Sequence, residues 1–214
     1  LVPGLLGFIR LLGYPYWYGI VSALRRQGAQ VFPVLLSSVH SSEVRGEQLL
    51  ERIAQVLQET GADKVHLIGH SQGALSARYA AALKPQWVAS VTSVAGPNHG
   101  SELADFLLRW APSGSVREKL LAAVMRGVAR CMAWLESAYK GPRLPMDVRA
   151  AQQSLTTQGV AAFNALYPQG VAETWGGEGA EEVNGVRYYS WSGTLQAGIT
   201  NRGGNRWDGP NLAC

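Results

Sequence analysis

The stretch VHLIGHSQGALSARY, residues 65–79, decides the fold because it joins a buried strand to a helix through a tight turn. Its apolar start predicts a strand over residues 65–68, and the run from Ala74 onward predicts a helix. The turn GHSQG between them flanks Ser71 with two glycines, which the strained backbone of such a turn requires. A serine placed there meets the positive end of the helix dipole and is open to an incoming base. Ser71 is therefore the candidate nucleophile.

Strand and helix signals alternate through the first hundred residues. They are a strand ending within residues 1–8, a helix over 16–27, a strand over 30–36, a helix over 43–59, and strands over 64–69 and 87–97. Pro33 indicates that the strand over 30–36 lies at a sheet edge or that it ends near Pro33. Ser41 or Ser42 can cap the helix over 43–59. This alternation predicts a mainly parallel sheet with helices on both faces, whose carboxyl ends share one edge. RYYSWSG, residues 187–193, resumes the sheet. We expect a single α/β domain over residues 1–214.

Residues 101–165 carry helical signals with no convincing strand between them. Apolar side chains recur every four positions in one part of this segment: Val116, Leu120, Val124, Val128 and Met132. The segment is predicted to be an amphipathic helical insertion. Two interpretations remain open, a helix packed on the core or a mobile cover over an active site.

The composition narrows the class of protein. Hydrophobic residues make up 47% and charged residues 16%, which is typical of a globular domain. The net charge of +4 includes no run of like charges, so we expect no nucleic-acid partner. No apolar run is long enough to span a bilayer. The two cysteines, Cys131 and Cys214, permit one disulfide, and the start without Met is expected of a mature form or a fragment.

The chain has four histidines, and none of them suits the role of general base for Ser71. His70 is adjacent in sequence, but neighbouring side chains on a tight turn point in different directions. His66 falls inside a predicted strand, and His40 and His99 fall in predicted loops.

Two backbone amides are candidates for stabilising an oxyanion. The N–H of Gln72 follows the nucleophile directly, and the N–H of Leu5 in PGLLG lies in the loop after an early strand. Each such donor lowers an activation barrier by roughly 2.7–4 kcal/mol.

The chain resembles the secreted bacterial triacylglycerol lipases of the Pseudomonas and Burkholderia type, in the α/β-hydrolase superfamily. The motifs that carry the resemblance are PGLLGF, YPYWYGI, SEVRGEQLL, LIGHSQG, SVAGPNHGS, FNALYPQG, VNGVRYYSWSG and WDG. It implies that Ser71 is the nucleophile, Asp208 the triad acid, and Leu5 and Gln72 the oxyanion donors. It further implies that residues 101–165 form a lid that opens at an oil–water interface, that the protein is secreted, and that a dedicated foldase assists its folding.

The residues alone leave more than one candidate for the acid. An Asp-Gly pair in a polar loop is usually a turn, and Asp105 and Asp147 are alternatives within the helical insertion. In such hydrolases the histidine follows the acid along the chain. No histidine follows Asp208 here, so we expect the catalytic histidine to be missing from these 214 residues.

Other departures from the resembled family concern a histidine, a disulfide and a metal. Pro3 stands where the family usually has His, and Gly176 stands where the family has the cysteine that pairs with the equivalent of Cys214. Residues 193–207 contain no Asp or Glu, so the ligands of the family's structural calcium are absent and we expect no metal and no other cofactor.

The expected function is a serine ester hydrolase that cleaves acylglycerols through an acyl-enzyme on Ser71. One alternative is a carboxylesterase acting on short soluble esters. Another is a non-catalytic relative of the same fold that binds lipid or a partner.

Overall fold

The computed structural model describes residues 1–136, 144–172 and 179–193. Its elements are β1 (Arg10–Leu11), β2 (Tyr14–Pro15), α1 (Ile20–Arg26), α2 (Ser42–Thr60), β3 (Val65–His70), α3 (Gln72–Leu83), a 3-10 turn (Pro85–Trp87), β4 (Val88–Val94), α4 (Glu102–Trp110), α5 (Val116–Leu135), α6 (Val148–Leu155), α7 (Thr157–Leu166), β5 (Glu182–Val183) and β6 (Val186–Trp191).

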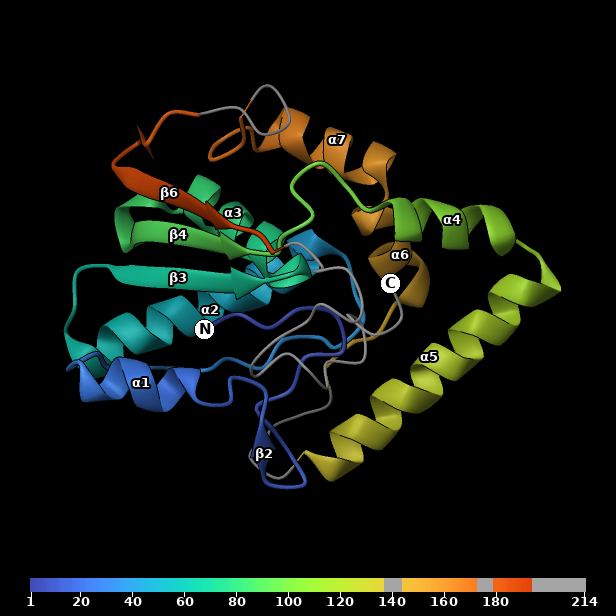
Figure 1. Cartoon of the computed structure of the whole chain (residues 1–214), viewed down its shortest axis with the longest axis horizontal. Coiled ribbons are helices and arrows are strands. Elements are labelled where there is room, and N and C mark those ends of the chain that lie inside the picture. Colours follow the sequence, from blue (N-terminus) through green and yellow to red (C-terminus); the bar gives the residue numbers. More distant parts are fainter. Residues whose placement is uncertain (137–143, 173–178, 194–214) are drawn as a thin grey trace, which may run out of the picture.

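The main sheet has the strand order β3-β4-β6-β5. β3, β4 and β6 run parallel and point the same way in Figure 1, whereas β5 pairs antiparallel with β6. Leu67 lies opposite Val91, and Val91 lies opposite Tyr188, so the three parallel strands end together. This confirms the predicted α/β class and brings the loops that follow β3 and β4 to one edge.

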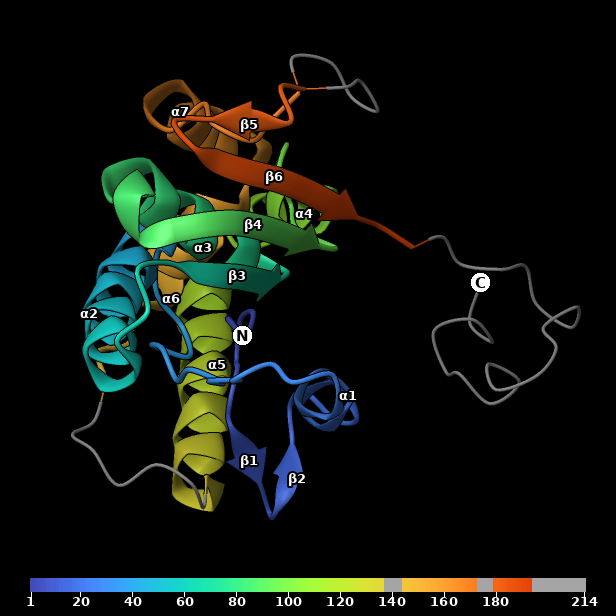
Figure 2. The same ribbon diagram turned by 90° about the vertical axis from the view of Figure 1, so that its left-hand side faces the viewer.

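The hydrophobic core lies between the sheet and the helices α2, α3 and α7. Leu49, Ile53 and Val56 form the buried stripe of α2, and Leu75 of α3 is fully buried against the sheet. In Figure 2, α1 and α2 lie on opposite sides of the β3 edge.

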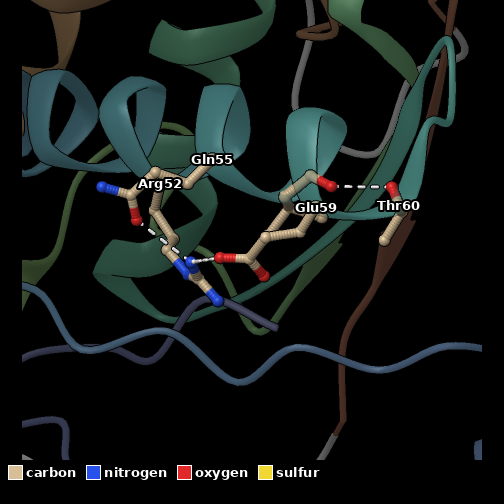
Figure 3. Close-up of polar contacts among 5 residues, drawn as sticks. Arg52, Gln55, Glu59 and Thr60 are labelled. Carbon is tan, nitrogen blue, oxygen red and sulfur yellow. Dashed lines mark hydrogen bonds and ion pairs between the residues drawn. The ribbon is translucent and has the colours of Figure 1, made fainter.

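The predicted helix over residues 43–59 is confirmed, together with its cap. The Ser41 hydroxyl accepts a hydrogen bond from Val44 N–H at 3.4 Å, at the start of α2. On the solvent side of α2, Arg52 donates to Gln55 at 3.0 Å and to Glu59 at 2.9 Å (Figure 3). The helix therefore has the amphipathic organisation that its sequence period predicts.

Three predicted elements differ from the structure. The strand predicted within residues 1–8 is present only as an isolated parallel bridge between Val2 and Gly69. The helix predicted over residues 16–27 begins only at Ile20, because Gly19 precedes it with φ 74°. Residues 30–36 do not form a strand. Within the described residues, their backbone hydrogen bonds to a neighbouring segment involve Leu1, whose ammonium donates to Phe32 O at 2.9 Å and whose carbonyl accepts from Val34 N–H at 3.0 Å. The side chain of Arg25 also donates to Val31 O at 3.1 Å. The short strands β1, β2 and β5 were not predicted, since two residues are too few for a periodic signal.

The insertion is helical, and its longest helix is α5. In Figure 1, α5 runs from the end of α4 down to the β1–β2 hairpin. Its four-residue apolar stripe does not pack on the core, because Val116, Leu120 and Val124 are 81%, 60% and 53% exposed. Of the two interpretations left open by the sequence, the packing of this stripe on the core is not what the structure has. The inward side of α5 consists of smaller or more flexible side chains, Ala122, Met125 and Ala129. Among the described helices, none combines the length and apolar character needed to cross a membrane.

Candidate active site

Ser71 occupies the sharp turn between β3 and α3. Its φ of 53° and ψ of −128° are strained for a residue with a side chain, at a cost of order 1–3 kcal/mol. Its N–H donates to Val94 O of the neighbouring strand at 2.9 Å, which holds the turn at the carboxyl edge of the sheet. The side chain is half-buried and makes no capping hydrogen bond to α3. The hydroxyl is thus not used to cap the helix that follows it.

Three glycines allow the backbone to close tightly around Ser71. A Cβ on Gly4 would lie 2.8 Å from Ser71 Cβ and 3.3 Å from Ser71 Oγ. A Cβ on Gly69 would lie 2.5 Å from Gly73 O, and one on Gly73 would lie 2.3 Å from Val2 O. The segment that carries Leu5 therefore lies directly against the candidate nucleophile, which is the position that its candidate oxyanion role requires.

The loop of residues 3–8, here called the oxyanion loop, is held by a buried arginine. Arg45 of α2 is 0% exposed and donates to the carbonyl oxygens of Ser37, Pro3 and Gly4, the last at 3.0 Å. In a trans peptide the C=O of Gly4 and the N–H of Leu5 point in opposite directions. Arg45 therefore fixes the direction of the Leu5 N–H. Burial lowers the pKa of Arg45 to about 10, so it remains charged near neutral pH.

A tyrosine connects the oxyanion loop to the turn that carries Ser71. The Tyr16 hydroxyl accepts from Gly4 N–H at 3.1 Å and lies 2.6 Å from His70 Nδ1. The hydroxyl proton is left to donate, and His70 Nδ1 accepts it in the tautomer that carries its proton on Nε2. Burial lowers the pKa of His70, which favours the neutral imidazole that can accept this bond.

Gln72 opens α3 and is fully buried. Its N–H belongs to the first turn of the helix, where backbone donors have no acceptor within the helix. Its side-chain Nε2 donates to His40 O at 2.7 Å and lies 3.4 Å from Ser154 Oγ of α6. The side chain thus anchors the start of α3, and the N–H remains available as a candidate oxyanion donor.

Three histidines have hydrogen-bond partners other than Ser71 in the described part of the chain. His70 pairs with Tyr16, His66 Nδ1 lies 2.8 Å from Ser90 Oγ, and His40 Nδ1 accepts from Ser41 N–H at 2.9 Å. His99 lies half-buried in the loop after β4.

Asp208, the candidate acid, lies outside the described residues, as do Cys214 and Gly176. The alternatives Asp105 and Asp147 both act at helix starts. Asp105 accepts from Thr157 N–H at 3.0 Å, and Asp147 accepts from Ala150 N–H at 2.9 Å.

Most of the residues on which the calcium and disulfide expectations depend also lie outside the described part of the chain. No group of three or more His, Cys, Asp or Glu within residues 1–136, 144–172 and 179–193 could hold a metal ion. Of residues 193–207, which bear on calcium, only Gly193 is described. Cys131 is exposed on α5 with a free thiol.

Two cavities lie away from Ser71. One of about 470 Å³ follows the free edge of β3, between α2 and the segment 29–34. The other, of about 420 Å³, lies beyond β4 and β6 and is lined by Asn98, His99 and Trp191. Ser71 lines neither cavity, so their size carries no information about the reaction at the turn.

Arg45 and Tyr16 were not singled out from the sequence. Arg45 carries a signal in retrospect, since it lies four residues before Leu49 on the buried stripe of α2, where an unpaired charge is unexpected. Tyr16 carries none, because its partners Gly4 and His70 are distant in sequence.

Comparisons with known proteins agree with this geometry. Residues 1–172 match the family described as the alpha/beta hydrolase fold. A triacylglycerol lipase of Pseudomonas fragi is 49% identical over 196 residues, covering 92% of this chain and 66% of the relative. A triacylglycerol lipase of Vibrio cholerae is 47% identical over 201 residues, covering 94% of this chain and 63% of the relative. The chain thus spans slightly less than two thirds of the length of these curated relatives.

A solved structure supports the same fold. The mature form of a Bacillus licheniformis lipase matches with a TM-score of 0.60 at 19% identity, covering 94% of this chain and 66% of that one. The resemblance inferred from the motifs is confirmed by the relatives, and the strand–turn–helix around Ser71 is the local structure that the motif requires. On the family match and the parallel sheet together, the chain belongs to the alpha/beta hydrolase fold family.

Proposed function

We propose that this chain forms the nucleophile-bearing part of a serine ester hydrolase that cleaves acylglycerols. Ser71 Oγ attacks the ester carbonyl carbon while a base takes its proton, and the oxyanion accepts hydrogen bonds from the Leu5 and Gln72 N–H groups. The alcohol leaves with a proton, and water then cleaves the acyl-enzyme. The observation that carries this proposal is the strained, half-buried Ser71 at φ 53°, packed directly against Gly4.

Asp208 is the proposed acid of the triad, where it would orient a histidine and stabilise its charged form. None of the four histidines in these 214 residues is proposed as the base. Without a base, a triad enzyme retains roughly 10³–10⁴-fold acceleration over water. We propose no cofactor and no metal.

The helical segment over residues 101–165 is proposed to act as a lid at an oil–water interface. The inward residues of α5 share one hydrophobic cluster with Leu5 and Leu6, so this helix lies beside the oxyanion loop. Its outward apolar stripe, with Val116 and Leu120 as the most exposed members, presents a surface suited to lipid. Secretion and a dedicated foldase are proposed on the family resemblance, which implies both.

A fluorophosphonate probe tests the nucleophile. Mass spectrometry should locate the adduct on Ser71, and Ser71→Ala should lose it. Added imidazole should accelerate labelling of the chain, because it replaces the base that none of its histidines supplies. Fast labelling that does not respond to imidazole would show that one of the present histidines serves as the base.

A substrate series separates the alternatives. Hydrolysis that rises when the ester passes its solubility limit supports a lipase, whereas flat kinetics across that limit would favour a carboxylesterase for short soluble esters. The absence of a Ser71 partner among His40, His66 and His70 favours the non-catalytic alternative. Lipid binding without any labelling of Ser71 would support it.

A further inference from the structure

Glu136 lies where the end of α5 meets the segment that leaves the oxyanion loop. Its carboxylate accepts from Ile9 N–H at 2.6 Å and from Arg10 N–H at 3.0 and 3.1 Å. Beside it, Leu12 N–H donates to Leu135 O at 3.4 Å, and Leu11 forms an antiparallel bridge with Glu136. One carboxylate thus holds two consecutive amides from a segment more than 120 residues away in sequence.

The position of Glu136 is not explained by the helix itself. A carboxylate at the carboxyl end of a helix faces the negative end of the helix dipole, which is unfavourable. Charge-assisted hydrogen bonds to two amides offset this and are stronger than bonds between neutral groups. Figures 1 and 2 both show the lower end of α5 beside the β1–β2 hairpin, which supports a specific attachment at this point.

The oxyanion loop has a strained backbone, and hydrogen bonds from other segments fix it at its start and at its exit. Leu6 has φ 55°, a left-handed conformation that is strained for a residue with a side chain. The start of the loop is held by Arg45 and Tyr16 through the backbone of Gly4. The exit of the loop continues into Ile9, which Glu136 holds from α5.

Packing connects the same two parts. Leu5 and Leu6 pack against the same buried cluster that Ala129 of α5 belongs to, and Ala122 and Met125 on the inward side of α5 pack against it as well. A displacement of α5 therefore acts on the oxyanion loop both through these side chains and through the backbone of Ile9. Small displacements matter here, because misplacing a reacting group by about 1 Å slows a reaction on the order of 10²-fold.

We propose that Glu136 is a positioning residue that couples α5 to the oxyanion loop through its hydrogen bonds to the Ile9 and Arg10 amides. The coupling makes the alignment of the Leu5 N–H with Ser71 depend on where α5 lies. Its catalytic consequence rests on the proposed function, since it acts through the oxyanion donors of Ser71.

The test uses Glu136→Ala and Glu136→Gln in the whole chain, with Glu51→Gln on an exposed position of α2 as the matched control. Amide hydrogen exchange reports the attachment directly. Protection of Ile9 and Arg10 should fall about 10- to 100-fold in Glu136→Ala, as expected for bonds to a charged acceptor. Protection of Leu6, whose N–H donates to Ser38 O at 2.7 Å, should fall as well.

Ser71 labelling by a fluorophosphonate reports the positioning. It should slow roughly tenfold in Glu136→Ala, less in Glu136→Gln, which keeps one carbonyl acceptor, and not at all in Glu51→Gln. Glu136→Asp should recover part of the rate. Retained protection of Ile9 and Arg10 in Glu136→Ala would overturn the attachment, and unchanged labelling despite lost protection would overturn the positioning role. If the parent chain shows no labelling, the proposed function fails, while the exchange of Leu6 still decides the coupling.

Discussion

Replacing Arg45 with methionine should greatly slow the acylation of Ser71 while leaving the protein folded. The guanidinium donates to the carbonyls of Ser37, Pro3 and Gly4, and a hydrogen bond involving a charged group contributes about 1.5–3 kcal/mol. Burial lowers the pKa of Arg45 from 12.5 to about 10, which corresponds to roughly 3 kcal/mol against the charged form. Methionine removes that cost and fills similar space. The net destabilisation should be about 2–6 kcal/mol, compared with a stability of about 5–15 kcal/mol for an ordinary domain.

The effect on acylation follows from the Gly4–Leu5 peptide plane. Without Arg45 the Gly4 carbonyl is released, and the Leu5 N–H, the proposed oxyanion donor, loses its fixed direction. Loss of one oxyanion donor slows the reaction on the order of 10²–10³-fold. The assay is the rate of fluorophosphonate labelling of Ser71, measured at a temperature where thermal unfolding shows the variant to be folded.

Arg78→Met is the matched control for this experiment. Arg78 is 1% exposed and, like Arg45, has a pKa lowered to about 10 by burial. It donates to Tyr167 O, Asn164 Oδ1 and Gln169 O, none of which belongs to the oxyanion loop. It should lose comparable stability while labelling stays within about threefold of the parent. Equal labelling rates for the two variants would refute the reasoning, because they would show that Arg45 acts on stability alone.

Three further outcomes are expected. Gly4→Ala should abolish labelling of Ser71, because the new Cβ would lie 2.8 Å from Ser71 Cβ, and an activity above a tenth of the parent's would contradict the close approach. The protein should gain stability as the pH rises toward about 6.5, because burial lowers the pKa of His70 and the unfolded state binds more protons there; an NMR titration of His70 at or above 6.5 would disprove this. Leu49→Ala, at a site 1% exposed, should lower the free energy of unfolding by about 2–5 kcal/mol, whereas Leu120→Ala, at a site 60% exposed, should change it by less than about 0.5 kcal/mol in the same denaturant titration.

The elements that could be predicted from the sequence are those whose signals are local. The helix over residues 43–59 repeats its apolar residues with the helical period and carries its own cap at Ser41, and both features are confirmed. The turn at Ser71 is specified by the two glycines beside it, because no other residue admits the backbone contacts made at Gly69 and Gly73. The parallel sheet followed from the alternation of strands and helices, since short right-handed crossovers leave few other arrangements.

Local signals failed where the partner is distant in sequence. The period of α5 correctly predicts a helix but not which side faces inward, because that side is chosen by a hydrophobic cluster with residues distant in sequence, among them Val39 and Val148. The strand predicted over residues 30–36 is absent because strand formation needs a paired neighbour, and in the described part of the chain Leu1 is the residue whose backbone bonds to this segment.

The sequence by itself determined the family, the turn that presents Ser71 and the helices that flank the sheet. Only the tertiary structure brought Arg45, Tyr16 and Glu136 to the oxyanion loop from three separate segments. The physical reason is that a periodic pattern records how a residue relates to its neighbours along the chain. A hydrogen bond between Ile9 and Glu136 leaves no such record, because it forms only after the chain has packed.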